Sequence, residues 1–372
     1  MLPGPRAVRL LPLLLCLLLA GCGAPATAPD PAGREIRRAV ADWSRQPPDA
    51  LAALPLTRWT YEVTSVRRDG PRALVRADLS YRLAGYDTDP AGSGRELALA
   101  REDGAWRVRA DRPAPGAPAQ LWDQGEVTVV RGAHGLVLGG GGQPPRTLEA
   151  VAAGTDRAVG AASAAWPRPW AGRVVVLVPA SLERMAELLG GEPDAYRGLG
   201  AVTTGRAGAG PGPADRVVIN PQGYAELSER GRQIVLTHEV THVATRAATS
   251  ATTPLWLSEG FADWAAYRGS DITPERAAPA LGRAVRRGEL PGSLPDEGAF
   301  AFGTDPEAAA RAYEGAWLAC RLIAARWGED ALVRLYEETG RRPLPDALGR
   351  TLSTDPAALT AAWREALREE LR

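Results

Sequence analysis

Two short stretches of sequence decide the fold of this chain: HEVTH at residues 238–242 and LWLSEGFADW at residues 255–264. The chain contains three histidines in 372 residues, and His238 and His242 are two of them. Residues four apart lie on one face of a helix, so both imidazoles can reach one metal ion at ~2.0–2.1 Å while Glu239 projects beside them. The spacing predicts a helix that carries a metal site. The alternative is a pair of surface histidines on a helix.

A catalytic metal site of this kind uses three protein ligands and keeps one position open, so two imidazoles do not complete it. The second stretch supplies a carboxylate, Glu259. Together, H-E-x-x-H and W-L-x-E-G-F-A resemble the gluzincin metallopeptidases, the clan of thermolysin and aminopeptidase N. They are most similar to the peptidase-MA-like domains of bacterial secreted proteins. The resemblance covers residues 148–338 in organisation and is close between residues 234 and 267.

The resemblance implies a ligand set and a catalytic group. His238, His242 and Glu259 would hold Zn²⁺, and Glu239 would act as the general base. For Glu259, the alternative is a carboxylate at a helix N-terminus that is stabilised by the helix dipole.

Two further residues take roles from the same resemblance. Asp263 lies one helical turn after Glu259, where thermolysin-like members orient a ligating histidine; the alternative is a solvated aspartate. Tyr313, in Y-E-G-A, is similar to the Y-x-x-G-A tyrosine of aminopeptidase-N-like enzymes, whose phenol stabilises the oxyanion. Here one residue fewer separates the tyrosine from the glycine. The alternative is a helix-surface or core tyrosine.

One aminopeptidase feature is missing from the segment expected to supply it. Those enzymes have a G-x-M-E-N strand that anchors the free amine of the substrate, whereas the strand-like segment DRVVIN at residues 215–220 contains no glutamate. This difference disfavours an aminopeptidase. The backbone of that segment is expected to pair with an extended peptide, which suits an endopeptidase.

The first residues predict an export signal. Arginines precede an apolar run at residues 10–19, which is too short to cross a ~30 Å hydrocarbon layer as a permanent helix. The run leads into L-A-G-C, which resembles the lipobox of bacterial lipoproteins and implies lipid on Cys22. We expect a signal peptide at residues 1–22, a tether at 23–32, and an outward-facing lipoprotein on the bacterial cell membrane. The alternative is an ordinary secreted protein.

The remaining chain is expected to be α+β in two parts. A helix at residues 33–43 followed by alternating segments between 59 and 110 resembles the small roll of cystatin-like and nuclear-transport-factor-like domains. The roll is predicted over residues 33–138, and a glycine-rich linker over 139–146. A gluzincin-like metallopeptidase domain is predicted over 147–372, with a small sheet and a mainly helical C-terminal half.

Composition fits a globular protein and excludes several classes. Apolar residues make up 45% and charged residues 24%, which is enough apolar surface for a sizeable core. The 44 basic residues balance 44 acidic ones, so we expect no nucleic-acid partner. Cys320 would be the one cysteine left after signal removal and lipidation, and its apolar helical surroundings predict a buried side chain.

The sequence therefore predicts a zinc-dependent metallopeptidase at the cell envelope, acting on peptide or protein substrates as an endopeptidase. A hypothesis of a different class stays open. In it, the chain is a catalytically silent zinc-binding lipoprotein that works as a binding or scaffold module through its N-terminal roll.

Overall fold

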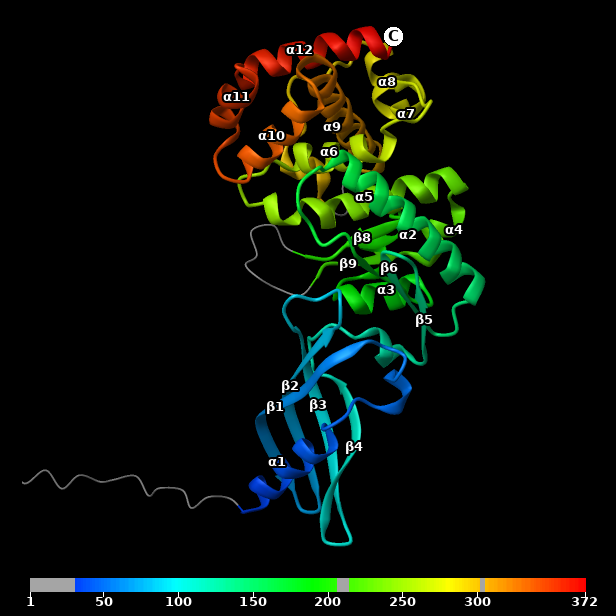
Figure 1. The fold of residues 1–372 in the computed structure, drawn as a ribbon, viewed down its shortest axis with the longest axis vertical. Coiled ribbons are helices and arrows are strands. Elements are labelled where there is room, and N and C mark those ends of the chain that lie inside the picture. The colour runs from blue at the N-terminus through cyan, green and yellow to red at the C-terminus, as the bar shows by residue number, and fades with distance from the viewer. Residues whose placement is uncertain (1–30, 206–213, 302–304) are drawn as a thin grey trace, which may run out of the picture.

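The computed structural model describes residues 31–205, 214–301 and 305–372 (Figure 1). The predicted signal peptide, Cys22 and nearly all of the predicted tether lie outside the described residues. Within them the chain is mixed α and β and contains two sheets, as the α+β prediction requires. None of the described helices has the length and apolar character needed to cross a membrane.

The first sheet is an antiparallel meander in the order β1-β2-β3-β4. Its hairpin turns use Gly70 and Gly104, whose φ angles of 55° and 81° suit glycine best. One helix, α1, packs against the sheet. This is the predicted helix and meander, and its resemblance to cystatin-like rolls stays a prediction. The element bounds are α1 (Pro31–Trp43), β1 (Leu56–Asp69), β2 (Arg72–Leu83), β3 (Ala91–Glu102) and β4 (Ala105–Pro113).

The second sheet has the order β5-β6-β7-β9-β8, with parallel pairs inside it and antiparallel strands at both edges. Its strands are β5 (Val127–Arg131), β6 (Gly135–Gly140), β7 (Val174–Val178), β8 (Ala201–Thr203) and β9 (Arg216–Ile219).

The structure differs here from the predicted domain boundaries. Strands β5 and β6, which the prediction assigned to the roll, belong to the second sheet. Gly139 and Gly140, which the prediction placed in a linker, are buried residues of β6. A Cβ atom at Gly139 would lie 2.5 Å from Leu148 Cδ1, and one at Gly140 would lie 2.8 Å from Leu121 Cδ1. These glycines therefore serve close packing and not chain flexibility.

The described helices of the second part lie mainly on the side of this sheet that faces away from the first sheet (Figure 1). The predicted helix that carries the first motif is α5, and it begins after Ser228, whose side chain accepts a hydrogen bond from Gly231 N. The helices are α2 (Pro145–Ala165), α3 (Leu182–Leu189), α4 (Pro221–Glu226), α5 (Glu229–Thr245), α6 (Leu255–Tyr267), α7 (Pro274–Ala277), α8 (Pro279–Arg286), α9 (Pro306–Trp327), α10 (Glu329–Thr339), α11 (Leu344–Leu352) and α12 (Pro356–Glu370).

Helices α6 and α9 cross very closely at Gly260. A Cβ atom there would lie 2.3 Å from the backbone oxygen of Ala316 and 3.0 Å from Cys320 Sγ. Cys320 is fully buried at this crossing, and burial raises the pKa of its thiol well above the usual value. The N-terminal half of α9 carries Tyr313, whose ring lies beside that of His238 on α5.

The first sheet and the second sheet share a core. One face of β2 is buried along its length: its first half lies under α1, and its second half, with Leu79 and Leu83, packs against Leu138 and Val175 of the second sheet. The side chain of Asp87 is fully buried between the two parts and forms an ion pair with Arg216, at 2.8 Å between Oδ1 and Nη1. Apolar contact and a buried ion pair therefore join the two parts.

Candidate metal centre

Helix α5 carries the first motif and is built with two different faces. Thr237, Thr241 and Thr245 form one buried face, where each hydroxyl donates to the backbone oxygen four residues earlier at 2.7–2.9 Å. These local bonds satisfy the three hydroxyl donors within the helix. Thr245 Oγ1 also accepts a hydrogen bond of 3.2 Å from Tyr336 Oη of α10. The other face of α5, which carries His238 and His242, lines a cleft.

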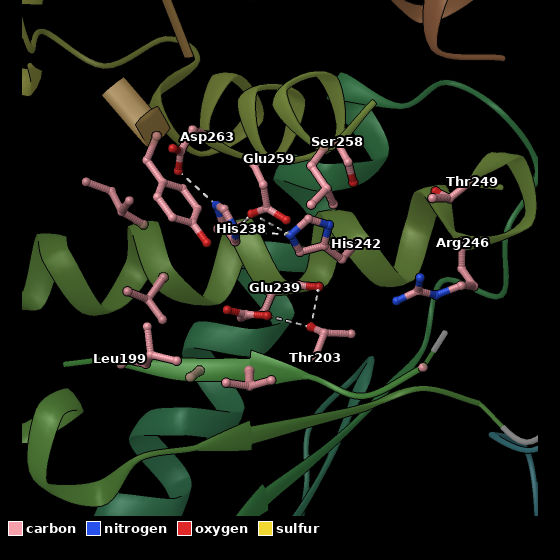
Figure 2. A pocket seen from close by; sticks show the side chains of 18 of the residues that line it. Leu199, Thr203, His238, Glu239, His242, Arg246, Thr249, Ser258, Glu259 and Asp263 are labelled. Carbon is pink, nitrogen blue, oxygen red and sulfur yellow. Dashed lines mark hydrogen bonds and ion pairs between the residues drawn. The ribbon is translucent and has the colours of Figure 1, made fainter. Parts of the chain in front are cut away.

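Three side chains from two helices converge at the cleft (Figure 2). His238 and His242 come from α5, and Glu259 comes from the first turns of α6. The two imidazole Nε2 atoms lie 3.0 Å apart, and Glu259 Oε2 lies 3.2 Å from His238 Nε2 and 3.4 Å from His242 Nε2. The structure thus brings together the three residues that the sequence proposes as ligands.

The donor set and its spacing fit a tetrahedral zinc ion. Two ligand atoms at ~2.1 Å from a tetrahedral centre lie about 3.4 Å apart, which is close to the separations found here. Two imidazoles and one carboxylate are a frequent protein ligand set in catalytic zinc sites. The three side chains line a cleft of about 460 Å³. The site can therefore hold a metal ion and still admit a substrate.

Asp263 orients one of the imidazoles. Its Oδ1 lies 2.8 Å from His238 Nδ1, so that nitrogen is engaged and Nε2 is directed to the cleft. Burial disfavours a charged imidazole, but the charges and hydrogen bonds of Asp263 and Glu259 outweigh it and raise the pKa of His238 well above its usual value. Burial likewise opposes ionisation of Glu259, yet the facing imidazoles hold the pKa of that carboxyl well below its usual range. The imidazoles that face Glu259 therefore favour the ionised form of its carboxyl group.

Glu239 lies beside the three candidate ligands and is not itself one of the ligands. It is buried, with 8% of its surface exposed, and it lines the cleft below the two histidines (Figure 2). Its Oε2 accepts a hydrogen bond of 2.6 Å from Thr203 Oγ1. A carboxylate next to the site, and outside the ligand set, is placed to accept a proton.

Tyr313 of α9 also lines the cleft, and its ring centroid lies 6.4 Å from that of His238. The altered spacing of its motif therefore does not turn it away from the site. Burial, reinforced by the charge of Glu259 and of two other carboxylates, raises the pKa of Tyr313 well above its usual value. The phenol stays protonated and can donate a hydrogen bond into the cleft.

One wall of the cleft differs from the prediction. The segment at residues 215–220 was expected to pair with a peptide, but β9 lies inside the sheet with β7 and β8 hydrogen-bonded on its two sides. The edge strand is β8, and residues 198–203 line the cleft. Sequence reasoning missed β8 because three residues are too few to show a strand alternation. It also missed Thr203 and Arg246 in the lining; Arg246 had one signal, its position one turn beyond His242.

Comparison with known proteins gives distant structural neighbours. No protein-family model and no curated protein matches the sequence. Among solved structures, the fold is similar to yeast LTA4 hydrolase, with 11% identity, a TM-score of 0.41 and coverage of 81% of this chain and 57% of that one. It is also similar to an M1 zinc metallopeptidase from Deinococcus radiodurans bound to a Tyr-Ser-Ala substrate, with 13% identity, a TM-score of 0.34 and coverage of 86% and 94%. The chain thus spans little more than half the length of LTA4 hydrolase.

Proposed function

We propose that this protein is a zinc-dependent endopeptidase. The observation that carries the proposal is the convergence of His238, His242 and Glu259 on one point of an open cleft that also contains Glu239 and Tyr313. Structural zinc sites are closed by four protein ligands, whereas catalytic sites use three and leave a position open. A binding or scaffold module would need neither a buried general base nor a protonated phenol beside such a site.

The residues around the ligands divide the chemistry between them. Zinc, when bound, supplies Lewis-acid polarisation of the scissile carbonyl and lowers the pKa of water. Glu239 accepts the proton of the attacking water and returns it to the leaving amine, which is general base and then general acid catalysis. Tyr313 donates a hydrogen bond to the oxyanion that develops on the carbonyl oxygen. Asp263 keeps His238 in one tautomer and orientation.

The carboxylates of the cleft support internal cleavage. An aminopeptidase must anchor a free ammonium group, for which it needs an uncommitted carboxylate. Among the described residues that line the cleft, Glu259 faces the two histidines, Asp263 bonds to His238, and Glu239 bonds to Thr203. The outer side of β8 pairs with no described strand, so it is available to an extended peptide in the β-augmentation mode.

The experiment is to purify the chain without residues 1–22 and measure its metal content and its peptide cleavage together. We expect about one zinc per chain. Internally quenched peptides with both ends blocked should be cleaved, cleavage should stop with a chelator, and it should return with added zinc.

Two results would contradict the proposal in different ways. Cleavage confined to peptides with a free N-terminus would identify an aminopeptidase. Zinc binding without cleavage of any peptide in a broad library would favour the catalytically silent binding module.

We also propose that the protein acts at the outer face of the bacterial cell membrane, anchored through lipid on Cys22. The support is the lipobox-like L-A-G-C that ends the apolar run. Cys22→Ser is expected to move the protein from the detergent phase to the aqueous phase, or to leave its precursor uncleaved. Cys16→Ser is the matched control, because that cysteine leaves with the signal peptide. A Cys22→Ser protein that still partitions into detergent would disprove the anchor.

A further inference from the structure

We infer that Thr203 is a positioning residue that holds the general base in its working orientation. The inference rests on the proposed peptidase function and assigns a task to a residue outside the zinc motif. Thr203 Oγ1 lies 2.6 Å from Glu239 Oε2 and 3.1 Å from the backbone oxygen of the same residue. A hydroxyl has one hydrogen to donate, and the shorter of the two contacts is the one to the carboxyl oxygen of the side chain.

This bond fixes a side chain that would otherwise be mobile. A glutamate side chain has three rotatable bonds, and a general base must stand within hydrogen-bond reach of the proton that it removes. Thr203 engages Oε2, while Oε1 of Glu239 has no hydrogen-bond partner among the described residues. One oxygen is therefore held and the other is left for the attacking water.

The setting of Thr203 makes it a rigid support. It is the last residue of β8, opposite Val217 of β9, and the next residue along the chain continues the pairing through a bond of 2.8 Å from Thr204 N to Arg216 O. Alternation along the strand points Ala201 and Thr203 towards α5 and Val202 away from it. Its β-branched side chain is restricted at χ1, so the hydroxyl direction is set by the strand.

The same strand is the one on which an extended peptide would pair. Residues 198–203 line the cleft, and the outer side of β8 pairs with no described strand. The strand that receives the substrate backbone therefore also holds the catalytic carboxylate. Substrate alignment and base alignment depend on one element, which keeps their relative position fixed.

The test compares Thr203→Val with Thr203→Ser in the zinc-loaded chain lacking residues 1–22. Valine keeps the shape of threonine and removes the donor, whereas serine keeps the donor and removes a methyl group. We expect kcat for a blocked peptide to fall roughly 10- to 100-fold in Thr203→Val, the effect of losing one hydrogen bond to a charged group. KM and zinc content should stay within about twofold, and Thr203→Ser should recover most of kcat.

Thr204→Val is the matched control, because that hydroxyl faces away from the cleft and accepts from Arg216 N at 2.8 Å. An equal loss of kcat in this variant would show that disturbance of β8, and not the bond to Glu239, causes the effect. A parental kcat in Thr203→Val, or a Thr203→Ser variant as slow as Thr203→Val, would overturn this inference alone. A parent chain that binds zinc and cleaves nothing would overturn it together with the proposed function.

Discussion

Glu239→Gln is expected to reduce peptide hydrolysis by roughly 10²–10⁴-fold while the zinc content stays at the parental level. Glutamine has the size of glutamate and can still accept the hydrogen bond from Thr203, so the cleft should keep its shape. Its amide cannot take a proton from water, and the general base is lost. Single-turnover rates at equal zinc loading, with zinc measured by mass spectrometry, give the comparison.

Glu229→Gln provides the control for this experiment. That glutamate lies in the first turn of the same helix and is exposed to solvent, away from the cleft. The Glu229→Gln variant should hydrolyse the blocked peptide at the parental rate. Parental activity in Glu239→Gln would show that another group removes the proton and that Glu239 has a different role.

The second large effect is expected for His242→Ala, which removes one of three ligands. Loss of a partner that only orients a ligand typically lowers metal affinity 10–100-fold, so loss of the ligand itself should lower it by more than about 100-fold. Zinc is expected to bind the folded state and not the unfolded state. The Tm of the parent should therefore rise with added zinc. His242→Ala should show no such rise and no hydrolysis.

His134→Ala is the matched histidine control. His134 is exposed on a turn, where its Nδ1 lies 3.0 Å from the backbone oxygen of Gly172, and it has no part in the cleft. This variant should bind zinc and respond to it like the parent. Full zinc occupancy in His242→Ala would mean that the metal sits on other residues.

The sequence was informative where short-range spacing decides position. His238 and His242 lie one turn apart on a single helix, and their common direction follows from helix geometry alone. Glu259 and Asp263 follow the same rule on α6. Bringing the two helices together is a tertiary result, and it was reached through the resemblance of the motif and not through spacing.

Other features could not be predicted, because their meaning depends on what packs against them. The glycines of residues 139–142 were interpreted as a linker, but Gly139 and Gly140 are buried where neighbouring side chains leave no room for a Cβ atom. Thr203 carries no local signal, since its partner Glu239 lies on another element. Long-range contact, and not local preference, gives each of these residues its role.

The core shared by the two sheets limits how this protein can change during evolution. Deletion of the N-terminal part, with the first sheet and α1, would uncover Leu138 and Val175 and would remove Asp87, the carboxylate that Arg216 now faces. The lost burial of those apolar side chains would destabilise the half that remains. The neighbour of Arg216 in the chain, Asp215, bonds to Arg246 in the wall of the cleft, at 2.6 Å from Nε. Selection on the half that contains the cleft therefore also acts on the N-terminal part, and the two should be inherited as one unit instead of being exchanged as separate modules.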